Sequence, residues 1–377
     1  MRPVHLLRVA LPLAALLSLS GCLDSGGGGS DDDTRTGSLN ANGVSGLSYT
    51  TASRTGETDA RGHFEYYPGE TVSFRVGDLE LASGVPAKEF VTPLEFFAAT
   101  RSKLDTPSTD DEGLRTHTLT EQAVLSDNAL INLTRLMLAL NWEENLQDNA
   151  GLEYRERVIN QLNAALPNLT APIDFTVSED AFAHTGSATE PAASPANQLL
   201  AAICFYPEDD ELCEEPPTQA EIDALPPRPE DDEDVEPGVQ YQEDLQNKRD
   251  RILEAARTLD DFDREAAEDY LTRELNAITT VYGNRYYLDD ATATYPASAT
   301  EIQSVEVRKV DGDTELAQIE AISTRTQDVV VHSFDWQSAS VEYFVTGNPG
   351  GEAEIVISFR PDDTYRWLRK TLRVTIR

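Results

Sequence analysis

The sequence has few of the side chains that build reactive centres. It contains three cysteines and five histidines among 377 residues, and the later histidines are scattered one per region. It has no H-E-x-x-H helix, no G-x-S-x-G elbow, no S-x-x-K pair and no glycine-rich phosphate loop. We therefore expect a protein that is not an enzyme and has no cofactor. A hydrolase that uses a carboxylate pair is an alternative, because 67 acidic residues offer many pairs and no reason to choose one.

Basic residues are also scarce, with 30 lysines and arginines against 67 acidic residues and a net charge of -37. Such a surface repels nucleic acid and anionic lipid, so we expect no nucleic-acid partner. It favours solubility at high salt, where self-repulsion is screened. One basic cluster stands out near the C-terminus, and we predict it to be a contact surface: Arg366, Arg369, Lys370 and Arg373. The alternative is that these charges discourage edge-to-edge aggregation of the last strand.

Long apolar runs are missing except at the start of the chain. Residues 9–19 form a largely apolar run behind Arg2 and Arg8, too short to span a membrane as a mature helix, and no later stretch is long enough. The run leads into Leu-Ser-Gly-Cys22, which resembles the bacterial lipobox. That resemblance implies cleavage before Cys22 and lipid on its thiol, and Leu23 at the next position implies the outer membrane by the enteric sorting rule. An ordinary secretory signal with an incidental cysteine is the alternative.

The other two cysteines, Cys204 and Cys213, lie close together in the sequence. In an oxidising compartment this spacing predicts a disulfide, which stabilises the fold by roughly 2 to 3 kcal/mol. A zinc site is the weaker alternative, because no histidine is nearby.

Short apolar alternations broken by turn residues predict a β-sandwich module over residues 39–95. The stretch Gly56-Glu57-Thr58-Asp59-Ala60-Arg61-Gly62-His63-Phe64 resembles the G-x-T-D-x-x-G-x-F pattern of carboxypeptidase-regulatory-like modules. The resemblance implies a spacer or binding scaffold. In the plainer interpretation, Thr58, Asp59 and Gly62 build a tight turn and Phe64 fills the core.

The middle of the chain has a helical period. Between residues 121 and 169 one helix is expected to bury a single face, and a second helix follows from Tyr154. The segment Asn132-Leu133-Thr134-Arg135-Leu136 resembles the N-L-x-R-L helix that precedes a calcium-binding loop in many proteobacterial lipoproteins. Here the following loop, 141–151, lacks the acidic and glycine positions of that pattern, so whether a metal ion binds is left open.

The segment 208–236 holds fourteen acidic residues against one arginine and is rich in proline, which predicts a solvated linker. A weak cation-binding or partner-binding tail is the alternative.

The next two helical patterns predict a helical hairpin that breaks at 259–263. From Val281 the period becomes two, and Asp311-Gly312 and 348–351 are hairpin signals in a C-terminal antiparallel sheet or small sandwich.

The three tryptophans are expected to lie in the core; a sugar-binding platform would instead need Trp336 and Trp367 to share an exposed face.

The overall layout resembles a group of marine gammaproteobacterial lipoproteins that carry the label "organic solvent ABC transporter permease". A permease needs several membrane spans, so the resemblance implies at most an accessory or substrate-binding component.

The sequence thus predicts an α+β multidomain protein with a small N-terminal β-sandwich, a central helical region and a C-terminal antiparallel β-domain. We expect a lipid-anchored, non-enzymatic scaffold of the cell envelope, with the membrane and another envelope protein as its partners. The predicted segments are a signal peptide (1–21), a tether (22–38), the β-sandwich module (39–95), a helical region (96–203), the acidic linker with its cysteine loop (204–240), the helical hairpin (241–280) and the C-terminal β-domain (281–377).

Overall fold

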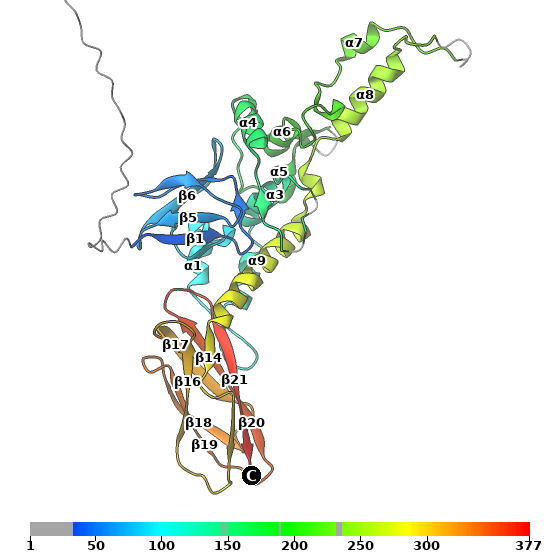
Figure 1. The fold of residues 1–377 in the computed structure, drawn as a ribbon. Coiled ribbons are helices and arrows are strands. Elements are labelled where there is room, and N and C mark those ends of the chain that lie inside the picture. Colours follow the sequence, from blue (N-terminus) through cyan, green and yellow to red (C-terminus); the bar gives the residue numbers. More distant parts are fainter. Residues whose placement is uncertain (1–32, 145, 148, 188–189, 231–235) are drawn as a thin grey trace, which may run out of the picture. The chain divides into compact units, whose positions relative to one another are not determined.

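The structure, a computed structural model, describes residues 33–377 except 145, 148, 188–189 and 231–235. The described residues contain both helices and several β-sheets, which confirms the predicted α+β class (Figure 1). Residues 34–377 form one compact unit. No helix in the described residues is long and apolar enough to cross a bilayer. The predicted signal peptide and Cys22 lie outside the described residues.

Most of the N-terminal strands form two sheets, of order β5-β1-β8 and β4-β3-β6-β7, while β2 pairs with β11 of the central region. Alternating apolar residues turn Phe64 and Phe74 toward each other, with ring centroids 5.3 Å apart. The strands are β1 (Arg35–Leu39), β2 (Val44–Ser45), β3 (Ser48–Thr50), β4 (Thr55–Glu57), β5 (His63–Tyr66), β6 (Thr71–Val76), β7 (Leu79–Pro86) and β8 (Phe90–Val91).

The stretch from Gly56 to Phe64, which resembles the carboxypeptidase-regulatory-like pattern, contains a tight turn, as the simpler structural interpretation predicted. The Asp59 carboxylate accepts hydrogen bonds from the backbone N–H groups of Arg61 and His63, 2.8 and 3.0 Å away. Gly62 has a φ of +70°, and a Cβ there would lie 2.5 Å from the carbonyl oxygen of Leu39. Phe64 is buried at the end of the motif.

The central region is mainly helical, with short two-stranded ladders. Its elements are α1 (Ala98–Leu104), β9 (Ser108–Thr109), β10 (Arg115–Thr116), α2 (Thr118–Val124), α3 (Asn128–Ala139), β11 (Leu152–Glu153), α4 (Glu156–Ala165), α5 (Glu179–Ala183), β12 (His184–Ser187), β13 (Glu190–Ala193) and α6 (Pro195–Ala201). Helix α3 begins where the Asp127 carboxylate accepts from the backbone N–H of Ala129. The apolar residues of the expected face, such as Leu130, Leu133 and Leu136, are buried, and the other residues from Leu130 to Ala139 are buried as well, because the helix is packed on all sides.

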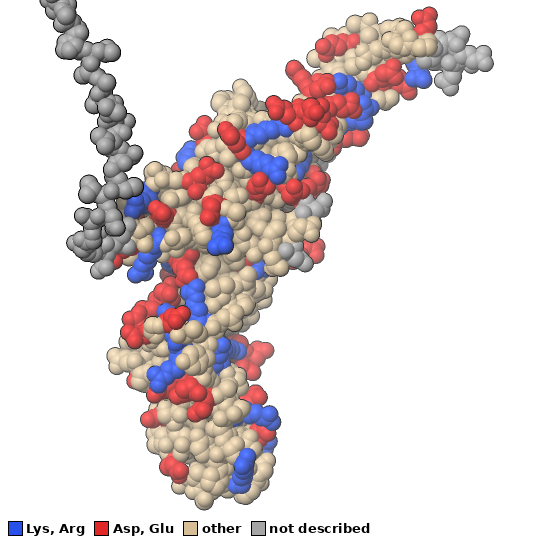
Figure 2. All heavy atoms as spheres, viewed as in Figure 1, with Lys and Arg blue, Asp and Glu red and all other residues tan. Residues whose placement is uncertain are grey.

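The acidic segment after Cys204 is not the structureless linker that its composition predicted. Its described part contains a short 3-10 helix (Glu211–Cys213) and α7 (Gln219–Asp223), which packs against α8 (Gln242–Glu254). Basic side chains of α8 neutralise part of its charge, since Lys248 pairs with Glu214 at 2.5 Å and Arg251 with Glu211 at 2.8 Å. Figure 2 shows acidic side chains gathered over α7 and α8 with basic ones among them.

Helices α8 and α9 (Arg264–Asn284) do not pair as the predicted hairpin. Helix α8 contacts α7, whereas α9 contacts α3 (Figure 1). Helix α9 contributes Leu271 and Leu275 to the core shared by the N-terminal strands and the central helices, and Ile278 and Tyr282 to the core of the C-terminal strands. One helix therefore links both cores, because its apolar residues continue past the end of the first.

The C-terminal strands form two four-stranded sheets within the described residues, of order β14-β16-β19-β18 and β15-β21-β20-β17. Alternate residues such as Val305, Val307, Ile355 and Ile357 meet in one buried core, as their spacing predicted. The strands are β14 (Tyr286–Leu288), β15 (Thr292–Tyr295), β16 (Gln303–Lys309), β17 (Leu316–Ser323), β18 (Val329–Asp335), β19 (Ser340–Val345), β20 (Glu352–Pro361) and β21 (Leu368–Ile376).

The two predicted hairpin turns connect different sheets instead. Asp311-Gly312 joins β16 to β17, and 348–351 joins β19 to β20. Within the described C-terminal sheets, which were predicted to be antiparallel, the pair β15 with β21 is parallel. Turn residues determine where the chain reverses but not which strand it pairs with afterwards.

Candidate binding site

A small hairpin of the central region lies on the C-terminal sheet. Strands β9 and β10 pair with each other, and the residues between them reach β21, where Arg369 forms ion pairs with Asp110 and, at 3.5 Å, with Glu112. The backbone N–H of Arg115 donates to the carboxylate of Glu320 on β17. On β20, the hydroxyl of Ser358 donates to the carbonyl of Arg115 at 3.1 Å. The hairpin therefore covers the sheet across three of its strands.

Beside this contact is a pocket of about 620 Å³, which we call the hairpin pocket. Its walls combine two arginines, one aspartate, an amide and aromatic rings. Strand register places Gln318 of β17 directly opposite Arg360 of β20. The lining residues are Asp105, Pro107, Arg115, Gln318, Arg360, Tyr365 and Trp367.

A buried polar cluster supports the aromatic wall of the pocket. The Tyr365 hydroxyl donates to the carboxylate of Glu121 on α2 at 2.6 Å. The backbone N–H of Trp367 donates to Nδ1 of His117 at 3.0 Å, so the ring proton is on Nε2, which lies 3.3 Å from the Thr279 hydroxyl. These bonds fix the backbone and ring that form the wall.

Arg366 places a guanidinium inside this cluster, with 2 % of the residue exposed. Its Nη2 atom lies 3.8 Å from the nearer carboxylate oxygen of Glu121, and its Cζ atom lies 4.6 Å from the centre of the Tyr365 ring. Its Nε and Nη2 atoms have no hydrogen-bond partner among the described residues. Charge attraction and the aromatic ring thus hold the cation where hydrogen bonds are incomplete.

Burial sets the ionisation of the cluster. Desolvation, with the nearby charge of Arg366, lowers the pKa of His117 to about 3. Desolvation raises the pKa of Glu121, against the opposing charge of Arg366 and the Tyr365 hydrogen bond. His117 is therefore neutral near neutral pH and acts as a hydrogen-bond acceptor.

The predicted basic contact surface is divided between environments. Arg366 is buried, while Arg369 and Arg373 are exposed and paired with acidic residues, Arg373 with Glu352 at 2.6 Å. Lys370 is half-buried and points to the opposite face of β21. Strand β21 lies inside its sheet, between β15 and β20, so the alternative of edge-strand charges was wrong.

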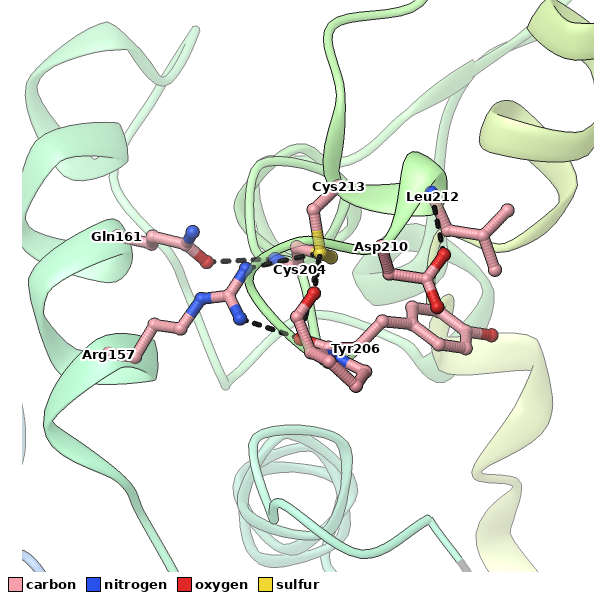
Figure 3. Close-up of a disulfide and its surroundings, with 8 residues drawn as sticks. Arg157, Gln161, Cys204, Tyr206, Asp210, Leu212 and Cys213 are labelled. Carbon is pink, nitrogen blue, oxygen red and sulfur yellow. Dashed lines mark hydrogen bonds between the residues drawn. A yellow bond between two sulfur atoms is a disulfide. The ribbon is translucent and has the colours of Figure 1, made fainter.

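The predicted disulfide is present between Cys204 and Cys213 (Figure 3). Arg157 of α4 donates to the carbonyl of Tyr206 at 2.6 Å and to the Cys213 sulfur at 3.1 Å. Gln161, one turn later, accepts from the backbone N–H of Cys204 at 2.8 Å. The loop is thus held against α4 by hydrogen bonds as well as by the covalent link.

The N-L-x-R-L residues bind backbone carbonyls. Asn132 donates to the carbonyls of Phe175 and Val177, and Arg135 to those of Leu259 and Phe262. In the following loop, the carbonyls of residues 141 and 142 accept hydrogen bonds from the buried Arg257. Among the described residues, which omit 145 and 148 of this loop, no group of three His, Cys, Asp or Glu side chains is placed to hold a metal ion.

The tryptophans differ from one another. Trp367 is buried, Trp142 is half-buried against the core, and Trp336 is 49 % exposed, which corrects its predicted core position. Trp336 and Trp367 therefore share no exposed face. His117, Glu121 and Arg360 were not predicted as site residues from the sequence. The burial of Arg366 did have a signal in the sequence, namely its aromatic neighbours Tyr365 and Trp367.

Comparison with known proteins identifies no family. The chain matches no protein-family model and no curated protein sequence. Among solved structures, domains 4 and 5 of the S-layer protein SbsC are 13% identical over 24% of this chain and 50% of that chain, with a TM-score of 0.18. The longer rSbsC(31-844) is 12% identical over 24% of this chain and 12% of its own, with a TM-score of 0.19. The chain spans half or less of these structures, and at such TM-scores the likeness supports no inference.

Proposed function

We propose that the protein is a lipid-anchored component of the cell envelope that acts by binding another envelope protein through its C-terminal β-domain. The anchor is supported by the lipobox-like sequence that ends at Cys22. The lipid would hold the folded residues near the outer membrane, on a tether that begins with a glycine- and serine-rich stretch.

The observation that carries the binding role is the exposed end of strand β18. This strand is at the edge of its sheet, and residues 332–335 are all exposed. Phe334 and Trp336, two residues apart, are 48 % and 49 % exposed. An edge strand presents unpaired backbone groups to which another chain can add, and large aromatic side chains are enriched in protein interfaces.

The test is a pull-down from solubilised outer membrane of the native organism with the purified protein as bait. We expect a specific partner with the wild-type chain and its loss with the Phe334→Ala/Trp336→Ala double variant. The matched control is Tyr287→Ala, which removes a 49 % exposed aromatic ring from β14 at the opposite edge of the same sheet. Equal recovery by both variants, or no partner above background with the wild type, contradicts the proposal.

A further inference from the structure

We propose that the hairpin pocket binds a small organic molecule with one carboxylate and an apolar body. This function is separate from that of the anchor and of the β18 edge, because the pocket and the edge share no lining residue. Binding pockets for small molecules commonly enclose about 300 to 1,000 Å³. The hairpin pocket, at about 620 Å³, is within that range and larger than a simple inorganic anion requires.

The charge of the pocket runs against that of the whole protein. Two arginines and one aspartate line it, on a chain whose net charge is -37. Arg115 is already engaged, since its Nε atom lies 3.8 Å from Glu320 and its Cζ atom lies 5.6 Å from the Trp367 ring centre. Arg115 therefore forms part of the pocket wall, and Glu320 neutralises part of its charge.

Arg360 is the group that recognises the carboxylate. Its Nη1 atom donates to the carbonyl of Thr364 at 3.1 Å, and it forms no ion pair with any residue that the structure describes. A guanidinium has five N–H donors, so most of this fork remains for a ligand. Gln318, opposite Arg360 in the sheet, adds an amide that can donate to the same anion.

The indole N–H of Trp367 is unsatisfied inside the aromatic wall. Trp367 lines the pocket and is 4% exposed, yet its indole N–H has no hydrogen-bond partner among the described residues. A buried donor without a partner is costly, but this nitrogen has almost no accessible surface, so the Trp367 ring and not its N–H faces the ligand.

The remaining walls select the rest of the ligand. Trp367, Tyr365 and Pro107 offer ring surfaces to an apolar body. Asp105 in the lining and Glu320 beside Arg115 repel additional negative charge, which favours one carboxylate over a polyanion. The bonds from Tyr365 to Glu121 and from Trp367 to His117 fix the aromatic wall before a ligand arrives.

Isothermal titration calorimetry of the purified full-length protein tests whether the hairpin pocket binds a carboxylate. The ligands are benzoate, its neutral isostere benzamide, and inorganic phosphate. We expect benzoate to bind and the other two to bind much more weakly. Arg360→Gln weakens benzoate binding by about tenfold or more, because it removes a charge-assisted hydrogen bond. Arg360→Lys keeps the charge and loses less. The matched control, Arg308→Gln, removes an exposed arginine from β16 in the other sheet and leaves binding unchanged.

Several results would overturn the proposal: no benzoate binding at millimolar concentration, equal binding of benzoate and benzamide, tighter binding of phosphate, or equal losses in the Arg360 and Arg308 variants. Circular dichroism establishes that each variant is folded. If Arg360→Gln does not fold, Gln318→Leu takes its place and is expected to weaken benzoate binding. Quenching of tryptophan fluorescence by benzoate, lost in Trp367→Phe but kept in Trp336→Phe, locates the ligand independently.

Discussion

At the scale of single residues, buried arginines organise the central region. Arg135 of α3 donates to backbone carbonyls in the segment 259–262. In return, Arg257 donates to backbone carbonyls at the end of α3 and just after it, at residues 139 and 142. Arg135 lies in a motif that is visible in the sequence, but its hydrogen-bond partners lie more than a hundred residues away and leave no local signal. Charge alone predicts exposure, and only the fold shows which carbonyl groups lack another donor.

Arg135→Met keeps an apolar stem but leaves the carbonyls of Leu259 and Phe262 without these donors. We expect the free energy of unfolding to fall by about 3 kcal/mol, since each unsatisfied buried group costs roughly 1 to 3 kcal/mol. Urea denaturation measures the loss. Arg61→Met, at an exposed turn position, is the control and should change stability little. Equal effects of the two substitutions would contradict the role given to Arg135.

His117 predicts a pH dependence whose sign follows from its lowered pKa. Its pKa is about 3 in the folded protein and 6.5 ordinarily, so between these values the unfolded chain binds the extra proton. Stability from this group is complete above pH 6.5 and falls as the pH decreases toward 3, by up to about 1.4 kcal/mol per pH unit. Urea denaturation of wild type and His117→Asn across this range measures it.

The asparagine keeps an acceptor for the Trp367 N–H but cannot take up the proton, so it lacks this slope. Glu121 has a raised pKa, and its contribution is therefore lost as the pH rises; it is present in both proteins and largely cancels in their difference. If the two stability curves run parallel below pH 6.5, His117 is not buried as a neutral acceptor.

At the scale of elements, strand faces were predictable and strand partners were not. The spacing of Val305 with Val307 and of Ile355 with Ile357 predicted the buried face of each strand correctly. The turns at Asp311 and at 348–351 were also in place, but the strands that follow them join the other sheet. A turn is encoded by a few adjacent residues, whereas pairing depends on packing across the whole domain.

The cysteine loop combines a covalent link with ion pairs, and composition revealed only the first. Replacing both cysteines with serine should lower the free energy of unfolding by about 2 to 3 kcal/mol, because the short loop gains conformational entropy when unfolded. The folded loop should persist, since Arg157, Lys248 and Arg251 still hold it. Denaturation of the double variant measures the first effect, and limited proteolysis of 204–216 the second. Immediate cleavage of this loop would show that the disulfide alone orders it.

At the scale of the whole molecule, the predicted segments share cores instead of folding separately. The N-terminal strands and central helices bury one common core, and helix α9 contributes to that core and to the C-terminal one. Local composition could not predict this, because a core shared by distant segments leaves no boundary signal. The hairpin pocket has the same origin, with a lining drawn from residues 105–115 and 318–367.

The proposed location depends on the lipid anchor, and intact-mass analysis of the protein purified from membranes tests that anchor directly. We predict the mass of the chain from Cys22 onward plus acyl groups, with a gain of two hydrogens on reduction of the Cys204–Cys213 disulfide. A mass without acyl groups would contradict the proposed location, and with it the choice of envelope proteins as partners.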